Sequence, residues 1–459
     1  MDAWVEKPAV AARPRSDLAG VVSIWAQVSA AGIGGPALQL ATMHRLLVQS
    51  KRWISEERFF HALSYCIALP GPDTQQLAIY VGWLAHRTIG AIIAGGLFIL
   101  PGAICMMALS FGYVTGADSM LGKAIFLGVR PAILAVMLGA IIRFGRHVLH
   151  SKWMVALAGA AFVGAFLKIS FPIIILTAAL VGIAAAVAGM RGLARPTGDT
   201  HGKTNSGDRL AEPADHTRPS VAQFLLSLAV WLALWLTPPI ALLAIFGPDN
   251  VFTQIAWLTG KVATMAIGGD YAVVADAADQ GVHSYHWLTA REMQEGIAMG
   301  EMVPGTIIIV TQFVGFIAAF RDPGSLPPLV AGVFGGVLAS WMTFCPCFLF
   351  ILLMAPFIEG LRRNALLNST LQAVTAAAIG MIVNLSVWFG LRTVFHHIDH
   401  IRYSHFRLDI PALSSIDPVA LALFACAAIA MLHFRVSAAA TLVVSSVVGL
   451  ALMLAGITV

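Results

Sequence analysis

The chain is poor in charged residues. Asp, Glu, Lys and Arg make up 11% of its 459 residues, whereas soluble globular proteins carry about 25%. Hydrophobic residues reach 58%, and the mean hydropathy is +0.83. This balance excludes an ordinary soluble domain and predicts an all-α polytopic membrane protein, because helices satisfy their own backbone hydrogen bonds in lipid. Apolar runs such as 173–188 and 438–457 approach the length that spans a bilayer, and we expect about 10–13 membrane segments in all.

Cysteine is also scarce, and no metal or nucleotide motif is complete. The five cysteines lie in apolar segments, so we expect buried thiols and no disulfide framework. Cys345 and Cys347 flank a proline, as in the soft-metal sites of copper pumps. The sequence has no nucleotide-binding loop of the Gly-x-x-x-x-Gly-Lys-Ser/Thr kind and no large soluble domain. We therefore expect no metal and no cofactor, and the modest net charge of +5 gives no indication of nucleic-acid binding.

Proline and glycine, by contrast, gather inside apolar segments. Residues 69–76 read Leu-Pro-Gly-Pro-Asp-Thr-Gln-Gln, between apolar stretches at 59–68 and 77–84. Because proline fixes φ and lacks a backbone N–H, this run predicts a broken helix whose second half starts near Pro72. Three glycines and a proline at 32–36 predict another break. A helix start offers unpaired N–H groups and a positive dipole end, although a kink that serves packing alone is the alternative.

The breaks recur along the chain. Three motifs appear twice, in the same order, at an offset of 234 positions; they are Gly34-Gly35 with Gly268-Gly269, Trp53 with Trp287, and Pro70-Gly71 with Pro304-Gly305. With small insertions, Val81-Gly82 corresponds to Val314-Gly315, and Leu100-Pro101 to Cys345-Pro346. The sequence is therefore an internal duplication with a period far longer than that of a solenoid repeat.

We divide the chain into five parts, which are a cytoplasmic N-terminal tail (1–17), a first repeat (18–190), a disordered cytoplasmic linker (191–219), an extra membrane segment (220–250) and a second repeat (251–459). The linker is charged, rich in Gly, Pro, Thr and Asp, and lacks apolar periodicity. The extra segment has no counterpart in the first repeat, and a single added crossing inverts the copy that follows. We therefore predict an inverted repeat with broken helices near the midplane.

The basic residues of the loops bear on this topology. Arg362-Arg363 supports inversion, whereas the later arginines at 392, 402 and 407 argue against it, and we resolve the conflict in favour of inversion. Locally, we expect a cap at Ser55, a capping box from Thr289 to Glu292, and an interruption of the long helix at 100–102. The histidines at 396, 397, 400 and 405 fall in what we expect to be a solvated loop.

These motifs resemble the long-chain form of the chromate ion transporter (CHR) family. The resemblance is carried by Gly34-Gly35-Pro36, by residues 52–55 (Arg-Trp-Ile-Ser), by residues 69–82 and by Leu100-Pro101, and it covers most of 20–459 apart from the linker. It implies a multi-pass inner-membrane protein, not an enzyme, that exports chromate or a similar tetrahedral oxyanion such as sulfate. The expected energy source is the proton-motive force. The expected partners are the oxyanion and the lipid bilayer, with a homo-oligomer left open.

The candidate anion site follows from the breaks. A desolvated oxyanion needs N–H donors or cations, and the backbone after Pro72 and Gly305 can supply donors. Arg130 has apolar flanks and a following proline, so we expect it to face the cavity. The predicted substrate-binding residues are Gly34, Gly35, Pro70, Gly71, Pro72, Thr74, Gln75, Gln76, Arg130, Gly268, Gly269, Pro304, Gly305, Thr306 and Gln312.

Three carboxylates beside the breaks, Asp73, Asp270 and Glu301, are the candidates for proton coupling. Asp73 lies in the first turn after Pro72, where it also suits a helix cap, and we favour capping for it. The second copy departs from the family pattern at Asp270, which follows the glycine pair, and at Thr306, which replaces a second proline.

Two other functions compete with oxyanion export. One is a membrane-embedded enzyme acting on a lipid phosphate, which would need an acid–base pair at the interface, and the sequence has no such pair in register. The other is a transporter of a different anion. A scaffold without transport activity would have no need of duplicated helix breaks.

Overall fold

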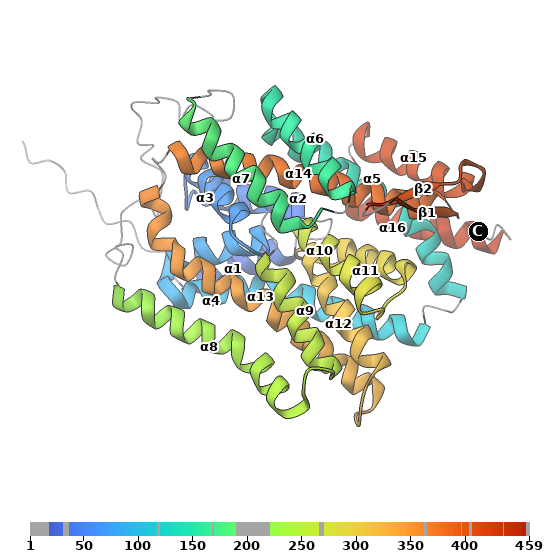
Figure 1. Ribbon diagram of the computed structural model, residues 1–459, viewed down its shortest axis with the longest axis horizontal. Coiled ribbons are helices and arrows are strands. Elements are labelled where there is room, and N and C mark those ends of the chain that lie inside the picture. Colours follow the sequence, from blue (N-terminus) through green and yellow to red (C-terminus); the bar gives the residue numbers. More distant parts are fainter. Residues whose placement is uncertain are drawn as a thin grey trace, which may run out of the picture.

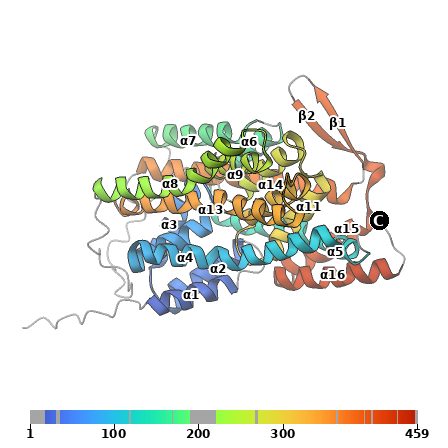
Figure 2. The same ribbon diagram turned by 90° about the horizontal axis from the view of Figure 1, so that it is seen from below.

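The computed structural model of the chain is a bundle of helices (Figure 1). It describes residues 18–30, 36–116, 120–167, 169–189, 221–265, 270–361, 365–395, 397–403, 406–434 and 436–455. The predicted N-terminal tail and the predicted linker lie outside the described residues. The predicted all-α class is confirmed, with the addition of one short antiparallel hairpin, β1 (Ile398–Tyr403) and β2 (Phe406–Pro411). The hairpin lies at one end of the bundle, where we expected a loop (Figure 2).

The first repeat contains seven α-helices and a π-helical turn among its described residues, namely α1 (Leu18–Ala30), α2 (Pro36–His44), η1 (Arg45–Ser50), α3 (Glu56–Ala68), α4 (Asp73–Gly116), α5 (Met120–Val148), α6 (Lys152–Phe166) and α7 (Phe171–Val187). Helix α8 (Val221–Phe246) follows and is the predicted extra segment.

The second repeat follows the same order in its described residues, with α9 (Val251–Met265), α10 (Asp270–Asp279), η3 (Gln280–Ser284), α11 (Ala290–Met302), η4 (Ile307–Ile309), α12 (Val310–Arg321), α13 (Pro328–Leu361), α14 (Ala365–Val394), η5 (Leu413–Ser415), α15 (Pro418–Leu432) and α16 (Ala438–Leu454). The predicted caps are confirmed. Ser55 Oγ accepts from the Arg58 N–H, and Thr289 forms a capping box with Glu292.

Helix α4 is a helical hairpin, because His86 and Arg87 have non-helical backbone angles. The chain folds back there so closely that a Cβ on Gly90 would lie 2.2 Å from the Gly82 carbonyl oxygen. In the second repeat α12 and α13 make the same hairpin, and a Cβ on Gly335 would lie 2.4 Å from the Gly315 carbonyl oxygen. The expected interruption at 100–102 is wrong, since the helix continues through Pro101. Membrane helices tolerate an interior proline where neighbouring helices surround it.

The two repeats exchange their last helices. Helix α5 packs against α15 and α16, whereas its second-repeat counterpart α14 packs against α6 and α7. Small residues allow the close approaches, with Gly128 against Gly449 in one case and Gly380 against Ala158 in the other. Each repeat therefore completes its bundle with helices of the other, and the two cannot fold as separate domains without exposing these faces.

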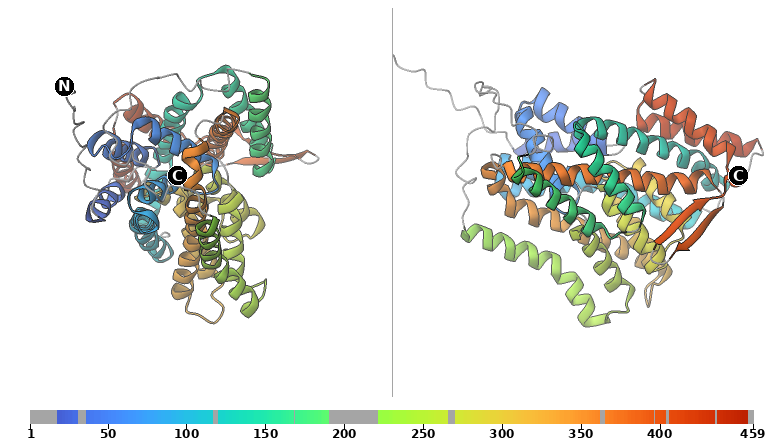
Figure 3. Two further views of the ribbon diagram at one scale, coloured as in Figure 1. Left: turned by 90° about the vertical axis from the view of Figure 1, so that its left-hand side faces the viewer. Right: turned by 45° about the horizontal axis from the view of Figure 1, so that its top comes forward.

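The surface is that of a multi-pass membrane protein. Four of the described helices, α4, α8, α13 and α14, are long and apolar enough to cross a bilayer. The long helices lie side by side along the longest axis of the molecule (Figure 2), and the left view of Figure 3 looks along this bundle. Large apolar side chains point outwards, including Leu226 of α8 (66% exposed) and Val187 of α7 (78% exposed), as expected where lipid covers the protein.

Candidate functional site

The first break joins α3 to α4. Leu69 leaves the helix with an extended backbone, Gly71 has φ +106°, and α4 starts at Asp73. The Gln76 side chain turns back and donates to the Pro70 carbonyl at 2.5 Å, while its backbone N–H donates to the Pro72 carbonyl at 3.0 Å. The predicted broken helix is therefore present, and only glycine suits the backbone at its centre.

The first turn of α4 holds polar atoms that are buried without a protein partner. Thr74, Gln75 and Gln76 are at most 2% exposed. The Thr74 hydroxyl, both amide atoms of Gln75 and the Gln76 Oε1 make no hydrogen bond in the structure. Buried polar groups are nearly always paired, because leaving one unpaired costs roughly 1–3 kcal/mol. These groups therefore mark a place where a ligand or water completes their hydrogen bonding.

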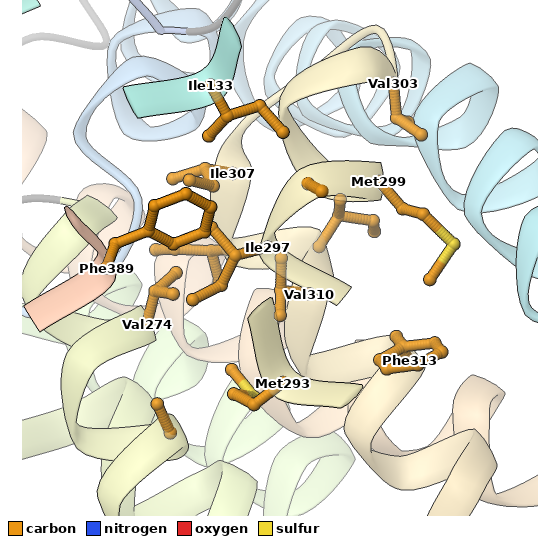
Figure 4. Close-up of a cluster of buried hydrophobic side chains, with 14 of the residues drawn as sticks. Ile133, Val274, Met293, Ile297, Met299, Val303, Ile307, Val310, Phe313 and Phe389 are labelled. Carbon is orange, nitrogen blue, oxygen red and sulfur yellow. The ribbon is translucent and has the colours of Figure 1, made fainter. Parts of the chain in front are cut away.

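The second break, between α11 and α12, has a similar backbone, but the turn that follows it has none of the buried, unpartnered side-chain atoms found at the start of α4. Gly305 has φ +129°, and the chain then forms the three-isoleucine turn η4. Two of its backbone N–H groups are occupied, since Ile308 donates to Thr306 Oγ1 at 3.4 Å and Ile309 donates to the Thr306 carbonyl at 3.1 Å. Around this turn Ile307, Val310, Ile297 and Phe389 form an apolar cluster (Figure 4).

Each break contacts the long helix of the other repeat. A Cβ on Gly71 would lie 2.9 Å from Cys347 Sγ of α13. Reciprocally, a Cβ on Gly102 of α4 would lie 2.3 Å from the Pro304 carbonyl oxygen. Gln39 of α2 adds a further contact with the second break, because its amide, oriented to suit both partners, accepts from the Gly305 N–H at 3.1 Å and donates to the Gly305 carbonyl at 3.2 Å. The breaks therefore lie between the repeats.

Arg130 lies in a cluster of its own. Its guanidinium pairs with the Glu295 carboxylate of α11, which is 6% exposed. The Tyr113 hydroxyl donates to the other carboxylate oxygen at 2.6 Å, and Arg291 Nε donates to Oε1 at 3.2 Å. Arg130 Nε is buried without a partner, so one donor is left for a further ligand.

The remaining predicted residues have separate environments. Gln312 is 1% exposed and fully bonded, since its amide donates to the Ala103 carbonyl at 2.9 Å and its Oε1 accepts from Ser340 at 2.8 Å. Asp73, the first residue of α4, accepts from the Thr74 N–H at 2.6 Å. Glu301 is fully buried in the last turn of α11.

Some predicted residues cannot be placed. The glycine pairs at 34–35 and 268–269 lie outside the described residues, and Asp270 is described only as the first residue of α10.

Sequence reasoning missed Gln39, Tyr113 and Glu295. Gln39 and Glu295 sit at positions where the other repeat has Val273 and His61, so the repeat itself gave no signal for them. Glu295 is buried with most of α11, and that burial cannot be read from the sequence of the helix.

A model of the chromate transporter family matches residues 19–183 and again residues 253–453. The chain belongs to the chromate transporter family. The double match confirms the internal duplication, and the unmatched stretch between the two regions contains α8.

Curated relatives extend over most of the chain. The chromate transport protein of Cupriavidus metallidurans is 27% identical over 417 residues, which cover 89% of each chain. The chromate transport protein of Pseudomonas aeruginosa is 28% identical over 356 residues, covering 76% of this chain and 75% of the relative. An uncharacterized transporter of Bacillus subtilis, YwrB, is 32% identical over 119 residues, covering 26% of this chain and 60% of the relative. No solved structure matches the chain.

These relatives are named as transport proteins and not as enzymes, in agreement with the prediction that the chain is not an enzyme.

Proposed function

We propose that the protein is a secondary active transporter that exports chromate, or a similar tetrahedral oxyanion, across the inner membrane. Family membership supports chromate as the substrate class. The observation that carries the site is the buried first turn of α4, where Thr74 and Gln75 offer hydrogen-bond donors without a protein partner.

The chemistry of this turn suits a transported dianion. The Thr74 hydroxyl and the Gln75 amide are neutral donors at the positive end of a helix dipole. Neutral donors hold an anion without the strong attraction of a buried cation, so the anion can also leave. The flexible Gln75 amide can turn its NH₂ group towards the anion, while its oxygen accepts from water.

Two further features belong to the proposal. The reciprocal contacts of Gly71 with Cys347 and of Gly102 with Pro304 favour a pseudo-two-fold relation between the repeats, and we infer that the axis lies in the membrane plane, as in an inverted repeat. Glu301 is the better candidate for proton coupling, because it is fully buried beside a break, whereas Asp73 bonds to the neighbouring N–H.

The test is uptake of labelled chromate into everted membrane vesicles that contain the protein, energised by respiration. We expect uptake above that of vesicles without the protein, and its loss on adding an uncoupler. Sulfate, molybdate and phosphate in excess rank the competing oxyanions. Uptake of sulfate with none of chromate would support transport of a different anion, and uptake of neither would contradict the proposal.

A further inference from the structure

The Glu295 cluster joins the two repeats. Glu295 lies on α11, the half-helix that leads to the second break, whereas Arg130 and Tyr113 lie on α5 and α4 of the first repeat. Both carboxylate oxygens are occupied, one by the two arginines and the other by the tyrosine hydroxyl. The cluster therefore fixes α11 to the first repeat through ionic and hydrogen bonds.

The corresponding positions of the other repeat, both among the described residues, do not carry the groups of this cluster. At the offset of 234 positions His61 of α3 corresponds to Glu295. Following the correspondence of Pro101 with Pro346, Thr375 of α14 takes the place of Arg130. The Thr375 hydroxyl donates within its own helix, to the Leu371 carbonyl at 2.8 Å. Helices α3 and α14 pack together as α11 and α5 do, but these two positions cannot form an ion pair between a carboxylate and a guanidinium.

A buried ion pair is a costly way to hold two helices together. Removing both charges from water costs several kcal/mol per ion, and packed apolar side chains often hold equally well. If the contact between α11 and α5 were static, the apolar cluster around it would be enough to hold the two helices together. That cluster includes Ile133, Ile297 and Met299 (Figure 4). Unlike apolar packing, an ion pair has strict geometry and separates into two groups that can each find other partners.

We propose that Glu295, Arg130 and Tyr113 form a latch between the repeats, closed in this conformation, which must open in each transport cycle. The inference rests on the proposed function, since only a transporter needs α11 to leave the first repeat. When the latch opens, the unpartnered Nε and the released face of Arg130 become available to the passing anion.

The test is a reversible crosslink across the latch. Arg130→Cys and Glu295→Cys are combined, with the exposed native cysteines Cys105 and Cys426 changed to alanine. A bifunctional thiol reagent that spans the distance of the former ion pair then joins α5 to α11, and a reductant releases it. We expect chromate uptake by everted vesicles to fall at least about tenfold on crosslinking and to return on reduction. Unchanged uptake by the crosslinked protein would overturn the latch.

A matched control joins two helices of one hairpin. The hydroxyls of Thr311 in α12 and Thr343 in α13 lie 3.1 Å apart. We expect Thr311→Cys with Thr343→Cys, oxidised to a disulfide, to leave uptake close to its rate before oxidation, because this hairpin moves as a unit. The protein with none of these changes, assayed in the same vesicles, tests the proposed function separately. If that protein takes up chromate and the crosslinked latch variant does so as well, the latch is refuted and the proposed function is not.

The two cysteine substitutions remove both charges of the latch, which can itself inactivate the transporter. A second experiment therefore exchanges the two charges. Arg130→Glu and Glu295→Arg should each lower the melting temperature, because each places two like charges together in a buried site, and each should abolish uptake per molecule of folded protein in the membrane. The combined exchange should recover a measurable part of it. Single variants that transport at the normal rate would overturn the proposal, as would variants that lose uptake only in proportion to their membrane level.

Discussion

The two helix breaks have similar backbones and different chemistry. Gly71 and Gly305 both have positive φ, and each break lies against the proline-containing long helix of the opposite repeat. At the first break the next helix starts with Thr74, Gln75 and Gln76, whose polar atoms include several without a partner. At the second break the corresponding residues are Ile308, Ile309 and Val310, and two N–H groups of the turn are satisfied within the protein.

This difference shows what duplication conserves. The geometry of a break depends on proline, glycine and close packing, so both copies keep it. The ligand chemistry depends on side chains that point into one place, and one copy can supply these for the whole molecule. We infer that the first repeat binds the anion, while the second break serves as the apolar counterpart against which the site is built.

The largest expected difference in uptake is between alanine substitutions of Gly71 and Gly305. Gly71→Ala puts a Cβ 2.9 Å from Cys347 Sγ at a φ that disfavours any side chain, so we expect chromate uptake to be abolished in membrane-inserted protein. Gly305→Ala meets the same kind of φ, but its Cβ would find no atom nearer than 4.0 Å. It should cost about 1–3 kcal/mol of stability and retain part of the uptake. Equal uptake by both variants would mean that the first break is only a kink.

The next largest effect is expected when a polar residue of the first break is replaced by the apolar residue found at the second. Gln75→Ile places at position 75 the residue found at Ile309, and it removes two buried unpartnered atoms. We expect uptake to fall at least about tenfold, while the melting temperature stays level or rises because an unsatisfied amide is gone. The matched change Ile309→Leu should leave uptake nearly unchanged. A Gln75→Ile protein that transports normally would exclude this amide from the site.

Whether a feature could be predicted from the sequence depends on how far apart in the chain its residues lie. The Pro-Gly breaks at Gly71 and Gly305 and the caps at Ser55 and Thr289 were predicted correctly, because each depends on residues close together in the chain. The fold-back at His86 and Arg87 was missed, since neither residue breaks helices by itself. The helix runs through Pro101, where an interruption was expected, and Gly102 beside it packs on the Pro304 carbonyl.

The candidate site shows the same limit. Its polar residues at 74–76 could be named from the motif, whereas their lack of partners depends on what surrounds them. The neighbours of the site come from the other repeat, as Cys347 does for Gly71 and Gln39 does for Gly305. The pairing of Arg130 with Glu295 joins positions 165 apart in the chain, and a single sequence contains no signal for such a contact.

A third variant tests whether Gln312 binds the anion or holds helices together. Its amide is already bonded to Ala103 and Ser340, in contrast to that of Gln75. Gln312→Leu should therefore lower stability by about 1–3 kcal/mol, because two partly buried partners lose their hydrogen bonds. Uptake per folded molecule should change little, and thermal unfolding in detergent measures the first effect. A loss of uptake without a loss of stability would show that Gln312 takes part in binding the anion.

The smallest effect concerns the end of the second-repeat hairpin, where Glu292 at the start of α11 pairs with Arg321 at the end of α12 at 2.5 Å. Burial alone would raise the pKa of Glu292, but hydrogen bonds from Arg321 and from the Thr289 backbone outweigh it, so the pKa lies below its ordinary value. Such a carboxylate stabilises the fold above its unfolded pKa of about 4.3. That contribution is lost as the pH falls through the lower pKa of the folded protein.

In the first repeat Arg58 occupies the position that corresponds to Glu292. We therefore expect this pH effect at the second-repeat position and not at the first. Because the Arg321 side chain is 46% exposed, solvent screening limits the pair to about 1 kcal/mol or less. We expect Glu292→Gln to lower the melting temperature slightly at pH 7, and this difference to shrink as the pH is lowered below about 4. Melting curves of both proteins across that range measure it. A difference that persists at the lowest pH would show that the effect of the substitution does not come from the charge of Glu292.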